Sequence, residues 1–381
     1  MLVRHNVRGL RLAVLSALAF VFLACSNSGS GGGPSSSGEP AAPNLASTQA
    51  ADLRTRLDLL LGEQVMIIAK ESAAAVNHTD DYAGYTALLT TNSNDLADMM
   101  RRAFGATTAA RFTQAWNLQN GYFVDYAIGV VSHNDTKSSG AIASLKTDFV
   151  PQFSQLMSDA SRLPLDPVTQ LTTQQMLQNK AFIDDAFAQK FGAFYTDLHT
   201  AYAQTSRLGD ALAGQIAHEF PDKFPGDPEL HPVDVRVSLN LLLQEHSYLA
   251  TMATNAAAAG RTAEKPASTA ALASNANMLG TLFATSFGNA AGTQFDRVWS
   301  ARDAALIGYA SGDATSKSAL TETFVAAFAS LAHVNQTPVA SQVDATIKVI
   351  DEQRAKSLKT IAGDDRMAAG SMQPLADSIQ G

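Results

Sequence analysis

The side chains best suited to chemistry lie in the second half of the chain, within segments that are otherwise apolar. Glu245 and His246 are adjacent, and carboxylate oxygens and imidazole nitrogens are common ligands of transition metals. Further along the chain, Arg302 carries a guanidinium group whose planar fork matches a carboxylate. The candidate binding residues of this region are Glu245, His246, Asn275, Asn277, Arg302 and Asp303.

Polar residues of this kind interrupt the apolar stripes of predicted helices in both halves of the chain. An α-helix rises about 1.5 Å per residue, so these positions fall near mid-height when the helices are antiparallel. We therefore expect one polar layer in each half: Gln64/Asn92/Gln119 in the first and His246/Asn275/Arg302 in the second, flanked by Glu63/Glu245 and Asn94/Asn277.

Three interpretations of the layers stay open at this point. The first is an internally satisfied hydrogen-bond network, because buried polar groups must be paired and polar core residues fix helix register. The second is a small-molecule, anion or metal site, which favours the second half because the amides of the first are weak metal ligands. The third is that the helix phase is wrong and the residues face water.

Metal binding is an alternative rather than the main expectation, and no cofactor is predicted. If a transition metal binds, His246 and Glu245 are its expected ligands. The chain lacks the Glu-x-x-His spacing of di-iron bundles and the His-Glu-x-x-His motif of zinc peptidases. His199 and His333 are isolated in sequence from other candidate ligands.

Familiar catalytic motifs are missing from the sequence. It contains no phosphate-binding Gly-x-x-x-x-Gly-Lys loop, no Gly-x-Gly-x-x-Gly, no Gly-x-Ser-x-Gly nucleophile elbow and no Ser-x-x-Lys. We therefore assign no catalytic residue and expect a protein that is not an enzyme. A hydrolytic enzyme with an unrecognised site is the last alternative.

The elements that carry these residues are repeated. Residues 53–160 and 235–335 look like two copies of one unit, because the tryptophans Trp116 and Trp299 and eight further pairs share one offset of 183 residues. Apolar residues at steps of three and four predict four helices in each copy. In the first copy, one helix ends at Gly105 and another has a kink at Pro151.

We predict an all-α fold of two duplicated up-down four-helix-bundle modules, each followed by an extra long helical segment. These segments run from Pro167 to about Phe220 and from Pro338 to about Ile379. The proline-rich stretch near residue 225 separates the copies. The predicted divisions are a signal peptide at 1–24, a lipidated cysteine with a flexible Gly/Ser/Pro linker at 25–50, and helical modules at 51–225 and 226–381.

Cys25 is the one cysteine of the sequence, and it ends a short apolar segment that follows a basic start. This layout is typical of a secretory signal. The ending Phe22-Leu23-Ala24-Cys25 resembles a bacterial lipobox, with Phe22 where that family usually has leucine. The resemblance implies cleavage before Cys25 and its lipidation. Since Ser26 rather than aspartate follows, it also implies attachment to the outer membrane, facing the periplasm. An ordinary signal peptide and a stray thiol are the alternatives.

Composition narrows the choice of partners. Removal of the signal takes away three arginines and no acid, which moves the formal charge from −8 to −11. Nucleic-acid binding needs clustered Lys and Arg, so no nucleic-acid partner is expected. The membrane, through the lipid, and an unknown envelope protein or small ligand are the expected partners.

The repeat resembles uncharacterised bacterial four-helix repeat proteins. The resemblance rests on Leu242-Leu243-Gln244-Glu245-His246 and on the asparagine-to-glycine pattern before the third helix, while the first copy departs from it at Gln64. It brings no established activity. We thus expect an envelope lipoprotein that acts as a helical scaffold or interaction protein or binds a small ligand. The alternative is metal or anion binding at the polar layer of the second bundle.

Overall fold

The computed structural model describes residues 46–380, and within them it is all-α with no strand. The predicted signal peptide, Cys25 and most of the linker lie outside the described residues. The first half contains α1 (Gln49–Asn77), α2 (Tyr82–Phe104), α3 (Ala106–Val131), α4 (Asp135–Ser144), the π-helical turn η1 (Leu145–Phe149), α5 (Val150–Ser161), α6 (Leu165–Phe187) and α7 (Phe191–Glu219).

The second half repeats this order from a new start at His231. It contains α8 (His231–Ala258), α9 (Lys265–Phe287), α10 (Asn289–Ala310), α11 (Thr315–Ser318), the π-helical turn η2 (Ala319–Phe324), α12 (Val325–Ala332), α13 (Gln336–Ala355), α14 (Ile361–Gly370) and α15 (Met372–Gln380). Each extra segment predicted as one helical stretch is divided, into α6 and α7 in the first half and into α13, α14 and α15 in the second.

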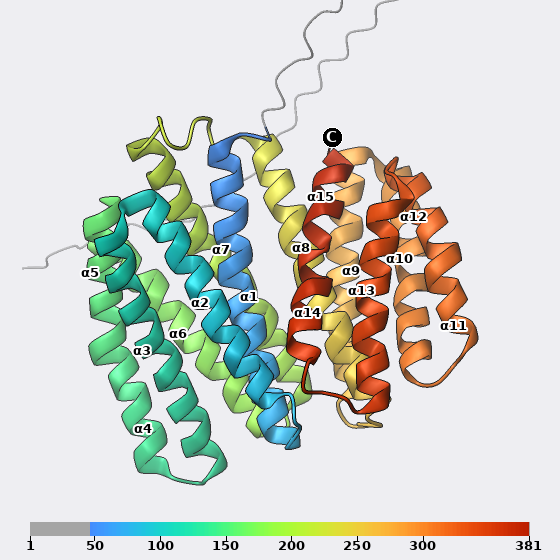
Figure 1. The fold of residues 1–381 in the computed structure, drawn as a ribbon, viewed down its shortest axis with the longest axis horizontal. Helices are drawn as coiled ribbons and strands as arrows, with labels where there is room; N and C mark the ends of the chain where they lie inside the picture. Colours follow the sequence, from blue (N-terminus) through green and yellow to red (C-terminus); the bar gives the residue numbers. More distant parts are fainter. Residues whose placement is uncertain (1–45, 381) are drawn as a thin grey trace, which may run out of the picture. The chain divides into compact units, whose positions relative to one another are not determined.

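Helices α1 and α8 lie side by side at the centre of the described body and begin at the same end of it (Figure 1). Around them, α7 of the first half packs on α9 of the second, and α14 of the second packs on α2 of the first. One hydrophobic core extends through both halves. The predicted boundary between modules falls in the loop between α7 and α8, and residues 46–380 belong to one compact unit.

Local sequence explains where the helices end and bend. Gly105 lies between α2 and α3 with φ of 87°, and Gly288 occupies the same place between α9 and α10 with φ of 97°. This left-handed region favours glycine, so the predicted stop at Gly105 is confirmed. Pro151 is the second residue of α5, and the wider turn of η1 just before it accommodates the missing N–H of the proline.

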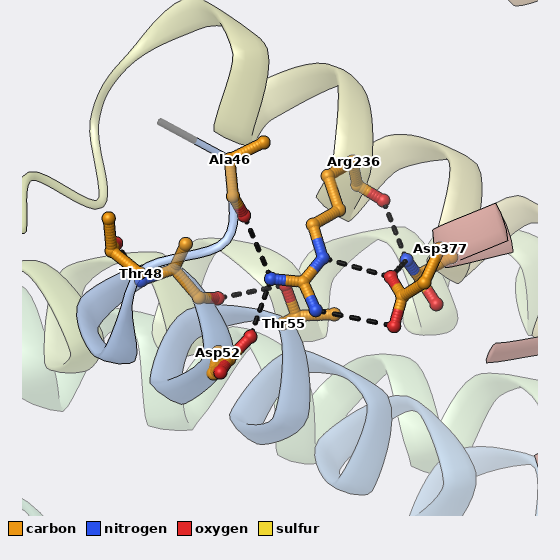
Figure 2. Close-up of polar contacts among 8 residues, drawn as sticks. Ala46, Thr48, Asp52, Thr55, Arg236 and Asp377 are labelled. Carbon is orange, nitrogen blue, oxygen red and sulfur yellow. Dashed lines mark hydrogen bonds and ion pairs between the residues drawn. The ribbon is translucent and has the colours of Figure 1, made fainter. Parts of the chain in front are cut away.

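The start of the folded body is fixed by Arg236 of α8 (Figure 2). Its Nη1 donates to the backbone carbonyl of Ala46 at 2.9 Å and to Asp52 Oδ1 of α1 at 2.6 Å. Its Nε donates to Asp377 Oδ1 of α15 at 2.9 Å. Arg236 thereby joins the first described residues, α1 and the last helix at one point. No helix among residues 46–380 is long and apolar enough to span a membrane.

Candidate functional site

The polar residues predicted for the second half meet in the core between α8, α9 and α10. Asn275 Nδ2 donates to Glu245 Oε2 at 2.8 Å, and Asn275 Oδ1 lies 3.0 Å from His246 Nδ1. His246 Nε2 lies 3.0 Å from Asp303 Oδ1. Glu245, His246 and Asn275 are all buried. The result is one continuous chain of hydrogen-bonding groups across the second bundle.

The orientation of Asn275 determines which nitrogen of His246 carries a proton. Its amide group also donates to the backbone carbonyl of Leu242, so its oxygen faces His246 and must accept a hydrogen bond from Nδ1. The other nitrogen, Nε2, lies 2.9 Å from the indole N–H of Trp299 and 3.0 Å from Asp303. The neutral ring accepts from Trp299 there, whereas the protonated ring donates to Asp303.

Arg302 extends this chain towards α13. Its Nη1 donates to Asp303 Oδ1 at 3.2 Å, and its Nη2 donates to Gln342 Oε1 at 3.2 Å. The guanidinium also lies over the rings of Trp299 and Phe324. Arg302 is 1% exposed, and this burial lowers the pKa of its guanidinium. The side chain is thus held by an acid, an amide and two aromatic rings.

Asn277 does not join this cluster. It is exposed on α9. A residue two positions after Asn275 is rotated by about 200° around the helix, which places it on the opposite face. The prediction that Asn277 flanks the buried layer is therefore wrong, and the same holds for Asn94, its exposed counterpart on α2.

The layer of the first half differs from its prediction in Gln119, and Asn92 bonds to Glu63 and the carbonyl of Leu60 rather than to Gln64. Gln64 Nε2 donates to Asn120 Oδ1 at 3.0 Å, and Asn120 Nδ2 donates to Ser93 Oγ at 2.9 Å. Gln119, the predicted member, is buried, but its side-chain oxygen has no hydrogen-bond donor among residues 46–380. Asn120 occupies the position of Asp303. Of the adjacent residues Gln119 and Asn120, it is therefore Asn120 that bonds to the neighbouring helices.

Glu245 also has a partner in the first half of the chain, which the sequence analysis does not predict. His199 of α7 places Nδ1 2.7 Å from Glu245 Oε1. The hydrogen bond to Glu245 raises the pKa of His199, and its partial burial opposes this effect. His199 is isolated in sequence from other candidate ligands, but the packing of α7 against the second half brings it to Glu245.

A cavity of about 310 Å³ opens beside this pair, between α7, α8 and α9. Its wall is made mainly of small or apolar side chains. Its lining residues include His199, Glu245, Leu249, Ala271, Asn275 and Met278. The chain of hydrogen bonds in the second bundle thus reaches a cavity through Asn275, Glu245 and the half-exposed ring of His199.

The equivalent glutamate of the first half has a different partner. Asn92 Nδ2 donates to Glu63 Oε2 at 2.8 Å, as Asn275 does to Glu245. The cation from the other half is here Arg366 of α14, whose Nε and Nη2 each lie 3.0 Å from one oxygen of Glu63. The two halves thus share a glutamate–asparagine pair, and each glutamate has a basic partner from the opposite half.

No group of three or more His, Cys, Asp or Glu side chains within residues 46–380 is arranged to hold a metal ion. Comparison with known proteins gives no further assignment: no family model, no curated protein and no solved structure matches the chain.

Proposed function

We propose that the protein is a lipid-anchored protein of the bacterial envelope that binds a small molecule in the cavity beside His199 and is not an enzyme. The observation that carries the binding proposal is the position of His199, a half-exposed imidazole held by a buried carboxylate on the wall of a 310 Å³ cavity. This volume is roughly twice the ~150 Å³ that holds benzene in an apolar cavity.

The chemistry of the wall supports a neutral ligand with an apolar body. Among its lining residues, Glu245 and His199 are the acid and the base, and together they form an ion pair when His199 is protonated. Leu249, Ala271 and Met278 supply apolar surface. A pocket of this kind binds through apolar contact and uses few polar groups to orient the ligand. When His199 is protonated, its Nδ1–H group is held by Glu245 and its Nε2–H group is left to donate to one hydrogen-bond acceptor on the ligand.

Three probes of similar size test the binding proposal on the full-length protein: acetophenone, ethylbenzene and benzoate. We expect acetophenone to bind about five- to tenfold more tightly than ethylbenzene, because a hydrogen bond contributes about 1 kcal/mol. Benzoate gains nothing over ethylbenzene, because the pair of protonated His199 and Glu245 has no net charge. Isothermal titration calorimetry measures all three below pH 6.5, where His199 is protonated because its hydrogen bond to Glu245 raises its pKa. Failure of every probe to bind contradicts the proposal.

Two alanines of α9 give a matched control. Ala271 lines the cavity, whereas Ala273 is exposed on the same helix. Ala271→Phe fills the cavity and abolishes binding of acetophenone and ethylbenzene, and Ala273→Phe leaves it unchanged. Equal effects of the two substitutions contradict the assignment of the site.

The envelope location is supported by the lipobox-like ending at Cys25 and the Gly/Ser/Pro-rich stretch after it. Its test is Cys25→Ser in a bacterial host, followed by membrane fractionation and labelling with a radioactive fatty acid. We expect the wild type to be labelled and to sediment with the outer membrane, and the variant to lose both properties. A variant that stays membrane-bound and normally processed would contradict lipidation.

A further inference from the structure

A second cavity, of about 370 Å³, lies on the other side of α8, where the final helix of the second half is interrupted. α14 ends at Gly370 and α15 begins at Met372, whereas the corresponding helix of the first half, α7, is continuous. Pro374 explains the interruption, because it has no N–H to donate to the carbonyl of Gly370 four residues earlier. Figure 1 shows α14 and α15 as two separate helices beside α8.

A buried hydrogen-bond acceptor on this wall lacks a donor. Asn240 of α8 lines the cavity and is 1% exposed, and its Oδ1 has no hydrogen-bond partner among residues 46–380. Its Nδ2 is already used, because it donates to the backbone carbonyl of Arg236 and to Asp377. A buried acceptor without a donor is costly, so a ligand with an N–H group fits here.

The charges of the wall leave one cation free. Arg366 is paired with both carboxylates of the wall, Glu63 at 3.0 Å and Asp95 at 2.5 Å. Arg56 is exposed at the same cavity and forms no hydrogen bond or ion pair within residues 46–380. The wall therefore offers a free guanidinium for a carboxylate, while its four charges sum to zero.

We infer that this cavity binds a small zwitterion of the α-amino acid class. Its ammonium group donates to Asn240 Oδ1, and its carboxylate pairs with Arg56. Leu59, Leu60 and Ala369 supply apolar wall for an aliphatic side chain. A zwitterion keeps the cavity neutral, which neither a carboxylate nor an amine alone does. This site is separate from the cavity beside His199, and either can exist without the other.

The first half shows what the interruption changes. Asp58 occupies the position of Asn240, but it packs under the continuous α7, where a Cβ atom added to Gly209 would collide with its carboxylate. The same position is thus closed by a helix in the first half and lines an open cavity in the second.

Three isosteric probes test the inference by calorimetry on the full-length protein: L-leucine, 4-methylpentanoate, which lacks the amine, and 3-methylbutylamine, which lacks the carboxylate. Glycine and L-alanine are titrated beside them so that side-chain size does not decide the result. We expect at least one amino acid to bind at least about tenfold more tightly than the acid or the amine, because a hydrogen bond to a charged group has about this effect. The inference is overturned if no amino acid exceeds both.

Two variants locate the site. Arg56→Gln is expected to weaken amino acid binding about tenfold and to leave 3-methylbutylamine unchanged, whereas Arg102→Gln, at another exposed arginine, changes neither. Asn240→Leu removes the acceptor and is expected to bring the amino acid down to the level of 4-methylpentanoate. If Asn240→Leu does not fold, Arg56→Gln still decides. Binding that is insensitive to Arg56→Gln overturns the assignment.

Discussion

Arg54 and Arg236 make the same bonds on the two sides of the interface between the halves. Arg54 Nη1 donates to Asp234 Oδ1 at 2.6 Å, and Arg236 Nη1 donates to Asp52 Oδ1 at 2.6 Å. Within each pair of equivalents the offset is 182 residues. Arg54 of the first half therefore binds an acid of the second half, and the equivalent Arg236 binds the equivalent acid of the first half. This reciprocal pairing is the pattern of a two-fold interface.

The backbone repeats this reciprocity. Arg54 Nη1 also donates to the carbonyl of Pro228 at 2.7 Å, and Arg236 Nη1 donates to the carbonyl of Ala46 at 2.9 Å. Pro228 and Ala46 have the same offset of 182 residues. The halves of this chain are thus joined as two subunits of a symmetric dimer are joined.

Equivalent contacts predict equivalent losses. Arg54→Ala and Arg236→Ala are each expected to lower the free energy of unfolding by about 1–3 kcal/mol, because both arginines are mostly buried and make charged hydrogen bonds. The loss stays moderate because Asp52 and Asp234 are more than a third exposed and regain water. Urea unfolding followed by circular dichroism measures it. Arg102→Ala is the exposed control. If Arg54→Ala and Arg236→Ala lower the free energy of unfolding no more than this control does, the two arginines do not stabilise the interface.

Asp58 predicts a pH dependence of stability. It is fully buried, and burial raises the pKa of its carboxyl well above the ordinary value, with the charge of Asp210 acting in the same direction. An acid whose folded pKa is raised stabilises the fold below its unfolded pKa of about 4, and this contribution is lost as the pH rises through the folded pKa. The free energy of unfolding of the wild type is therefore expected to fall as the pH rises from about 4 through the folded pKa of Asp58.

Asp58→Asn removes this dependence and copies the second half, where the equivalent residue is Asn240. We expect the two proteins to have similar free energies of unfolding near pH 4 and the variant to be the more stable at pH 8. Urea unfolding at a series of pH values makes the comparison. Parallel curves at all pH values would show that Asp58 does not titrate as its burial requires.

The pattern of the sequence was sufficient for the fold and for part of the polar cluster. Apolar residues at helical spacing predicted an all-α protein, which is confirmed, and they placed Asn92, Asn275 and His246 on stripes that are buried. Asn277 is close to Asn275 in sequence but lies on the opposite face of α9, so nearness in sequence does not place it in the layer. Arg302 lies on its stripe, but its partner Gln342 comes from a helix outside the predicted four.

The residues across the interface left no local signal. His199 and Arg366 contact Glu245 and Glu63 because α7 and α14 pack against the opposite half, and neither contact follows from the periodicity of a single helix. The repeat itself held a clue, since equivalent glutamates require equivalent partners once the halves pack symmetrically. Pro374, which interrupts the last helix, is by contrast a signal that the local sequence carries.

The His199–Glu245 pair predicts a specific titration. Its hydrogen bond to Glu245 raises the pKa of His199 above the ordinary value of 6.5. The pair therefore stabilises the fold below about pH 6.5, and this contribution is lost as the pH rises through the folded pKa. Glu245→Gln is expected to lower the pKa of His199, measured by NMR of the imidazole protons. Glu322→Gln, at an exposed glutamate, is the control, and a titration unchanged by Glu245→Gln would contradict the pairing.

His246→Gln tests whether the second polar layer is architecture or a metal site. Gln64 occupies this position in the first half and donates to Asn120, so glutamine at 246 is expected to donate to Asp303 in the same way. It loses the contacts of the imidazole with Asn275 and Trp299, and we expect a cost of about 1–3 kcal/mol in the free energy of unfolding.

Metal analysis of the wild type and of His246→Gln, both purified without chelator and without a His tag, distinguishes a structural layer from a metal site. Both nitrogens of His246 already have partners, and Glu245 is engaged by Asn275 and His199, so we expect no stoichiometric transition metal in either protein. About one equivalent of metal in the wild type, lost in His246→Gln, would instead show that Asn275 and Asp303 yield the imidazole to a metal ion. The layer would then be a binding site, and the binding of acetophenone beside His199 would have to be repeated with the metal present.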